Sequence, residues 1–185
     1  LALDDLLMAQ AMPAAARLFA DTCAACHGSA GAGGPGFPAL DDADWLWGGE
    51  PETLAETISI GINATDDSRL AEMPVFDWLA PADRQALATY VAALPQGNAP
   101  ADSAGATLFA ENCAACHGDG GTGGLLAGAP SLTDASVIYG QDEATILTTL
   151  RHGRRGVMPA WNQRLSPAEI NLLALYVTTL QKAKP

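Results

Sequence analysis

Hydrophobic residues recur at helical spacing in both halves of the chain, most clearly at its C-terminal end. Ser166 is followed by Pro at the first helical position and by Glu at the capping-box position, which marks the start of a helix. Apolar residues then form one stripe of that helix: Ile170, Leu173, Val177 and Leu180. This pattern predicts a helix with one buried face.

The same order of helices is predicted twice. A second copy of the final pattern occupies residues 81–94. Helices over 14–23 and 105–113 each contain Leu-Phe-Ala, and helices over 50–60 and 141–152 each have two apolar residues four positions apart. Residues four apart lie on one face of a helix, so each segment has a side suited to burial. The pattern therefore predicts an all-α protein.

The repeat also predicts the domain organisation. Residues 1–13 are a lead-in, 14–94 a first domain, 95–103 a linker rich in Pro, Gly and polar residues, and 104–185 a second domain. We expect Phe in each Leu-Phe-Ala to pack against the last helix of its own domain. Domains of this size have thin hydrophobic cores, and a large apolar cofactor at the centre of each would compensate.

Charge narrows the classes of partner. The 185 residues carry a net charge of −12, of which residues 1–94 contribute −11 and residues 95–185 contribute −1. This balance argues against nucleic acid. It suits either a basic partner on the first half or a generally solubilising acidic surface.

Membrane crossing is not expected within this segment, because no run of eighteen apolar residues occurs in it. The first residue is Leu rather than Met, so we expect a processed or trimmed chain. A signal peptide or an anchor upstream of the segment is compatible with both observations.

The chemistry is carried by a motif that uses all four cysteines. Cys-x-x-Cys-His occurs at Cys23, Cys26 and His27 and again at Cys113, Cys116 and His117. This spacing is typical of covalent haem c attachment, in which two thiols bond to the haem vinyl groups and the His binds iron. A single copy would also fit a thioredoxin-like pair, half a zinc site or chance. Two copies favour two covalently bound haem c groups.

A Met-Pro pair follows each motif, at Met73 and Met158. A thioether is a soft ligand suited to the second axial position of the iron, and Pro after Met stiffens the loop. We pair each Met with the His of its own half, His27 with Met73 and His117 with Met158. Exchange of the Met ligands between the domains is the alternative.

Four further residues are expected around the haems. The backbone carbonyls of Pro38 and Pro130 are candidates to accept a hydrogen bond from the second ring nitrogen of each His, with a simple turn proline as the alternative. Trp47 and Tyr139 are interpreted as walls of the haem pockets whose N–H or O–H reaches a propionate, or as plain core aromatics.

Two arginines complete the candidates. Arg154 and Arg155 lie just before the second Met-Pro. Their guanidinium groups are placed either to neutralise haem propionates or to remain in solvent.

A longer stretch carries a family resemblance. Residues 36–49 read Gly-Phe-Pro-Ala-Leu-Asp-Asp-Ala-Asp-Trp-Leu-Trp-Gly-Gly, and the second half has Gly-Ala-Pro-Ser-Leu-Thr-Asp at 128–134 and Gly-Val-Met-Pro-Ala-Trp at 156–161. These residues resemble the dihaem subunit III of cbb3-type cytochrome c oxidases, the FixP/CcoP family. The resemblance implies two tandem class I-like cytochrome c domains, each wrapped around one haem c. Members are usually anchored by an N-terminal transmembrane helix.

The leading functional hypothesis is therefore electron relay from a donor cytochrome to a terminal oxidase, by a subunit that is not itself catalytic. Covalent haem attachment takes place outside the bacterial inner membrane, so we expect a periplasmic location, with or without an anchor. A free periplasmic dihaem shuttle is the main alternative. A dihaem enzyme, such as a peroxidase or thiosulfate dehydrogenase, and a haem gas sensor are the others.

Overall fold

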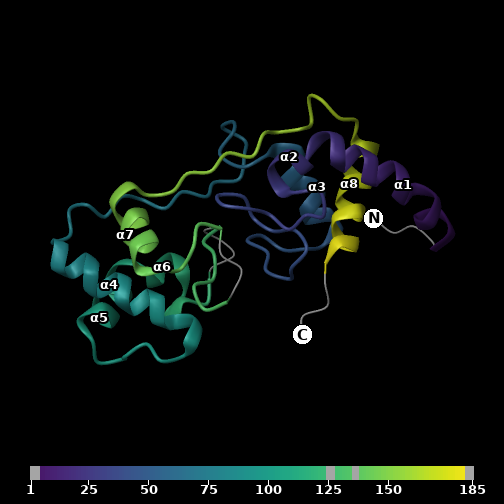
Figure 1. Ribbon diagram of the computed structural model, residues 1–185. Coiled ribbons are helices and arrows are strands. Elements are labelled where there is room, and N and C mark those ends of the chain that lie inside the picture. The colour runs from purple at the N-terminus through teal and green to yellow at the C-terminus, as the bar shows by residue number, and fades with distance from the viewer. Residues whose placement is uncertain (1–4, 124–127, 135–137, 182–185) are drawn as a thin grey trace. The chain divides into compact units, whose positions relative to one another are not determined.

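The structure, a computed structural model, describes residues 5–123, 128–134 and 138–181. The expected all-α class is confirmed, and within these residues extended segments pair only through isolated bridges. The helices in chain order are α1 (Asp5–Thr22), α2 (Ala24–His27), α3 (Pro51–Ile60), α4 (Pro81–Ala93), α5 (Ala104–Asn112), α6 (Ala114–His117), α7 (Glu143–His152) and α8 (Pro167–Leu180) (Figure 1). Two short 3-10 turns, η1 (Leu94–Gln96) and η2 (Asp119–Gly121), follow α4 and α6.

The start of α8 agrees with the sequence pattern, whereas the start of α1 does not. The capping box of α8 is present: the Ser166 hydroxyl accepts from the backbone N–H of Glu169, and the Glu169 carboxylate accepts from the backbone N–H of Ser166. Helix α1 begins earlier than predicted and runs through Pro13, so much of the lead-in is helical. A Pro inside a helix removes one backbone hydrogen bond and usually ends or bends the helix, so the local pattern predicted a later start.

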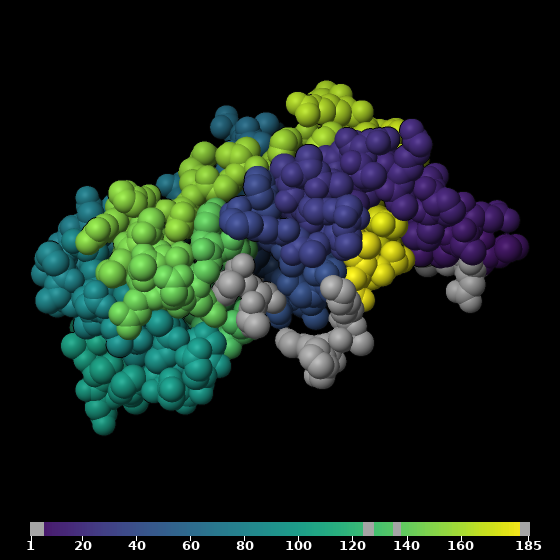
Figure 2. Space-filling view, in the orientation of Figure 1, coloured from purple at the N-terminus to yellow at the C-terminus, as the bar shows by residue number. Residues whose placement is uncertain are grey.

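The chain forms two compact units, and they are not the two halves of the sequence. Unit 1 contains α1, α2, α3 and α8, whereas unit 2 contains α4 to α7. The chain enters unit 2 after Arg69 and returns to unit 1 after Gly156. Figures 1 and 2 show the result in unit 1, where the yellow C-terminal helix α8 lies against the purple N-terminal helix α1.

The packing of the two Phe residues differs from the prediction. Phe19 on α1 stacks with Tyr176 on α8, with ring centroids 5.3 Å apart, and Phe109 on α5 stacks with Tyr90 on α4 at 5.5 Å. Each Phe therefore packs against the last helix of the other half, and the prediction of own-half packing is wrong. Helices α4 and α8 have the same apolar pattern, so either can cover either core. The short connection from α4 to α5 favours packing these two as neighbours.

Equivalent residues fill the two cores. In unit 1 the core is formed by Phe19, Leu54, Ile58, Ile170, Leu173, Ala174 and Val177. In unit 2 the corresponding core contains Phe76, Leu79, Leu87, Ala88, Val91, Leu94, Phe109, Cys113, Ile146 and Leu150. Leu173 and Leu87, which hold matching places on α8 and α4, are 1% and 0% exposed. Each core is thus closed by a helix from the opposite half.

Each half of the sequence thus contributes its Met-bearing segment and final helix to the unit of the other half, and we call this the exchange. It also makes the net charges of the two units similar. Residues 1–69 with 157–185 hold 12 acidic and five basic side chains, a net charge of −7. Residues 70–156 hold nine acidic and four basic side chains, a net charge of −5. The contrast between the halves of the sequence is therefore nearly absent between the units, which removes the reason to place a basic partner on the first half alone.

No helix in the described part of the chain is long and apolar enough to cross a membrane.

Matched substitutions in the two final helices test which core each helix covers. Leu173→Ala and Leu87→Ala should each lower the free energy of unfolding by about 2–5 kcal/mol, because each leaves a cavity in a packed core. In hydrogen exchange, Leu173→Ala should speed exchange in α1 and α3, whereas Leu87→Ala should speed it in α5 and α7. The opposite assignment, with Leu173→Ala loosening α5 and α7, would mean that each half packs on itself.

Two haem c attachment sites

Each Cys-x-x-Cys-His motif forms one helical turn directly after a longer helix. Cys23 donates its backbone N–H to the Phe19 carbonyl at 2.8 Å, and the N–H of His27 donates to the Cys23 carbonyl at 3.0 Å. The second copy repeats this geometry through the carbonyls of Phe109, at 2.8 Å, and Cys113, at 2.9 Å. All four cysteines are free thiols. Helix α1 or α5 thus fixes the first thiol, and the following turn fixes the second thiol and the imidazole.

The environment of these groups suits metal binding by the imidazoles. Burial lowers the pKa of His27 and of His117, and the hydrogen bond from each ring to a backbone carbonyl opposes that shift only partly. Both rings are therefore neutral near pH 7, the form that binds a metal. Burial raises the pKa of Cys23, and burial together with Cys116 raises the pKa of Cys113 to about 11.

The carbonyls predicted to orient the histidines do so. His27 Nδ1 lies 3.0 Å from the Pro38 carbonyl oxygen, and His117 Nδ1 lies 2.9 Å from that of Pro130. A carbonyl only accepts, so Nδ1 must carry the proton and donate it. Nε2 of each ring is left with its lone pair as the metal-binding nitrogen.

Each Met lies in the unit that contains the His of the other half, which is the reverse of the predicted pairing within each half. Met158 exchanges two backbone hydrogen bonds with Ile62, at 2.9 and 3.0 Å, and packs on the core of unit 1 together with Cys23. Met73 exchanges two with Arg154, also at 2.9 and 3.0 Å, and packs on the core of unit 2 with Cys113. Unit 1 therefore contains His27 and Met158, and unit 2 contains His117 and Met73.

Two glycines permit this close pairing of backbones. Gly61 and Gly153, at the C-terminal ends of α3 and α7, have φ of +72° and +65°. A Cβ on either would lie 2.5 Å from the carbonyl oxygen of Met158 or of Met73. Any other residue would push the Met-bearing segment away.

The aromatic residues predicted as pocket walls each lie under an arginine. The guanidinium carbon of Arg69 is 5.5 Å from the centre of the Trp47 ring, and that of Arg154 is 4.2 Å from the Tyr139 ring. Neither aromatic belongs to the buried core; Trp47 is half-buried and Tyr139 is 36% exposed. The structure thus places them at the edge of each unit. Their role as haem walls stays a prediction.

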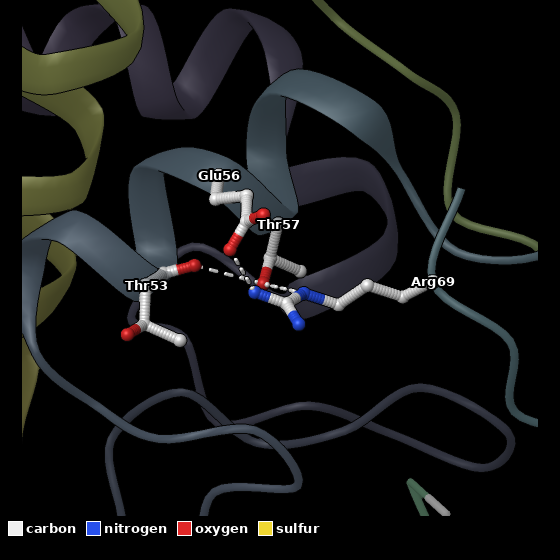
Figure 3. Close-up of polar contacts among 4 residues, drawn as sticks. All are labelled: Thr53, Glu56, Thr57 and Arg69. Atoms are coloured by element: carbon white, nitrogen blue, oxygen red, sulfur yellow. Dashed lines mark hydrogen bonds and ion pairs between the residues drawn. The ribbon is translucent and has the colours of Figure 1, made fainter. Parts of the chain in front are cut away.

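A threonine holds each of these arginines. The Nε–H of Arg69 donates to the Thr57 hydroxyl at 2.9 Å, and that of Arg154 donates to the Thr149 hydroxyl at 2.9 Å. Thr57 and Thr149 occupy equivalent positions on α3 and α7. Figure 3 shows the first arrangement, in which Glu56 also binds Arg69 through Nη2 at 2.6 Å.

Sequence reasoning missed Arg69 and named only Arg154 and Arg155 as candidate arginines. A signal was present, because Arg precedes Met by four residues in both copies, at Arg69 and Met73 and at Arg154 and Met158. The chain crosses between the units within this spacing. Each Arg therefore remains with its preceding helix while the Met joins the other unit.

The donor set of each unit fits haem c: two thiols, an imidazole with Nε2 available and a thioether, all around an apolar core. Together the fold and these sites define a dihaem c-type cytochrome. The comparisons with known proteins agree, since residues 13–95 match the family described as cytochrome c. Residues 100–177 match the family described as cytochrome c oxidase, cbb3-type, subunit III.

Curated relatives narrow the family. The chain is 43% identical to the cbb3-type cytochrome c oxidase subunit FixP of Bradyrhizobium sp. (strain ORS 278), over 98% of this chain and 65% of that protein. It is 48% identical to FixP of Azorhizobium caulinodans, over 88% and 57%, and 45% identical to subunit CcoP of Cereibacter sphaeroides, over 96% and 63%. The chain belongs to the FixP/CcoP family and binds two haem c groups covalently. It spans 57 to 65% of the length of these relatives.

The loop that carries the Pro38 carbonyl can be tested through two adjacent glycines. Gly33 has φ of +69°, and a Cβ there would lie 2.7 Å from the Phe37 carbonyl oxygen, whereas a Cβ on Gly34 would meet nothing within 4 Å. Gly33→Ala should lower the free energy of unfolding of the haem-loaded protein by at least about 1–2 kcal/mol, the cost of a left-handed non-Gly residue. Denaturant unfolding measures this, with Gly34→Ala as the matched control. Equal stabilities of the two variants would contradict the inference that the loop requires glycine at position 33.

Proposed function

We propose that this chain relays single electrons between a donor cytochrome and the cbb3-type oxidase to which its relatives belong. The observation that carries the proposal is the equivalence of the two sites. Each unit offers the same donor set, held by the same hydrogen bonds, so the chain can carry two one-electron centres in tandem. Haem iron supplies the change between ferric and ferrous states, and Met/His ligation raises its reduction potential.

The proposed iron ligands follow the units rather than the halves. His27 and Met158 would bind the iron in unit 1, and His117 and Met73 would bind it in unit 2. The cysteine pairs would bond to the vinyl groups. Trp47 and Tyr139 would flank the two haems, where the indole N–H and the phenol O–H could donate to a propionate.

Electron transfer is favoured over haem catalysis because a thioether is available to each iron. Catalysis or gas binding at a haem requires an open or labile axial position. In each unit the Met backbone is fixed by two hydrogen bonds to a neighbouring segment. We therefore propose a subunit without its own substrate chemistry, located in the periplasm, where haem c is attached.

The first test is the haem content and the ligand state. A pyridine haemochrome assay should find two haems per chain, and the sulfur-to-iron charge-transfer band of the oxidised protein should have the strength of two sites. The reduced protein should not bind carbon monoxide at neutral pH. Half of the band, or carbon monoxide binding at one haem, would instead favour a sensor or an enzyme.

The second test is the ligand pairing. In a Cys113→Ala/Cys116→Ala background, which keeps only the haem of unit 1, Met158→Ala should abolish the charge-transfer band and Met73→Ala should leave it. In a Cys23→Ala/Cys26→Ala background the two results should be reversed. Own-half pairing predicts the opposite in both backgrounds.

Loss of one haem can destabilise its unit, so the intact dihaem protein provides an independent readout. In NMR spectra of the reduced form, the methyl group of Met158 should give nuclear Overhauser contacts to residues of unit 1, such as Phe19. Contacts to Phe109 in place of these would refute the pairing.

A further inference from the structure

The two units have matching arginines, but in the described chain only the arginine of unit 1 is paired with a carboxylate. Arg69 in unit 1 and Arg154 in unit 2 each bind an equivalent threonine and cover an equivalent aromatic ring. In unit 1 the carboxylate of Glu56 lies 2.6 Å from the Arg69 guanidinium (Figure 3). The position equivalent to Glu56 on α7 is Thr148, whose hydroxyl donates to the carbonyl of Ala144 within its own helix.

Within the described part of the chain, the positive charge of the Arg154 guanidinium has no carboxylate beside it to balance it. Among the described residues no carboxylate lies within ion-pair distance of it, and its side-chain partners are Thr149 and Tyr139. In unit 1 the charge of Arg69, whose side chain is only 17% exposed, is balanced by Glu56. The same cationic position is thus neutralised in unit 1 and uncompensated in unit 2.

A second difference between the units also makes unit 2 more positive. Arg84 on α4 is 9% exposed and donates to the carbonyls of Asp77 and Leu79, and no carboxylate of the described chain pairs with it. The matching position on α8 is Ile170, which is 6% exposed and uncharged. Unit 2 thus contains two unpaired guanidinium groups where unit 1 contains an ion pair and an isoleucine.

Charge near a redox centre affects its two oxidation states unequally. Ferric haem carries one more positive charge than ferrous haem, so a nearby cation favours the ferrous form and raises the reduction potential. Pairing the cation with a carboxylate removes most of this effect at longer range. Partly buried charges are screened less by salt than exposed ones.

We propose that Glu56 is a positioning residue that sets the order of the two reduction potentials. It lowers the potential of the haem in unit 1, while the unpaired Arg154 raises that of the haem in unit 2. Electrons then pass from the haem of unit 1 to the haem of unit 2. This inference rests on the proposed function, because it requires two haems with the ligands assigned above.

The test is a set of redox titrations of the intact dihaem protein, followed optically. Glu56→Gln should shift the lower midpoint potential upward and leave the higher one in place. Thr148→Glu, which copies the acidic residue of unit 1 into unit 2, should shift the higher potential downward. The ion pair is largely exposed on its Glu56 side and contributes little to stability, so these variants should fold like the parent.

Asp66→Asn is the matched control for charge. Asp66 lies on the exposed loop that leads to Arg69, and its substitution removes the same charge from unit 1 without touching the ion pair. It should move neither potential as far as Glu56→Gln does. An equal shift in Asp66→Asn, or unchanged potentials in Glu56→Gln and Thr148→Glu, would overturn the inference.

These outcomes are separable from failure of the proposed function. Two haems with a charge-transfer band of full strength but unresponsive potentials reject only the role of Glu56. Fewer than two haems, or half of the band, reject the electron relay itself. A wild-type titration in which the haem of unit 1 has the higher potential, assigned in the single-haem backgrounds, would also overturn the proposed order.

Discussion

The arrangement of the molecule depends on one backbone interaction that occurs twice. A segment carrying Met pairs with the extended residue that follows α3 or α7, Met158 with Ile62 and Met73 with Arg154. In both cases the Met comes from the other half of the sequence. The pairing also determines which final helix covers which core, because α8 and α4 follow these segments directly. The crossing points lie at the surface, where Leu70 and Val157 are 72% and 58% exposed.

The exchange means that neither half of the chain contains all the groups of one site. The imidazole and both thiols come from one half, while the thioether and the closing helix come from the other. Two haem sites built in this way share their covalent framework. A change in the Met-bearing segment of one half therefore acts on the unit that holds the Cys-x-x-Cys-His motif of the other half.

The two sites are alike in ligands and unlike in charge. Ligand identity sets the broad range of a haem potential, whereas nearby charges adjust it within that range. The Arg69 and Arg154 positions show how the fold keeps one geometry while varying the charge. The two guanidinium groups bind equivalent threonines, Thr57 and Thr149, yet Arg154 itself pairs with a Met-bearing segment and Arg69 lies on the neighbouring segment. Glu56 then makes the two sites electrostatically different.

The sequence by itself determined the helices, the haem motifs and the carbonyls that orient His27 and His117, because these depend on local spacing within a few residues. It also identified the two Met-Pro pairs. Only the tertiary structure decided which Met lies in the same unit as which His, and that Arg69 lies over the Trp47 ring. Helices α4 and α8 have equivalent apolar faces, so either fits either core by local preference. The choice between them is made by connection lengths and long-range packing, which no local pattern encodes.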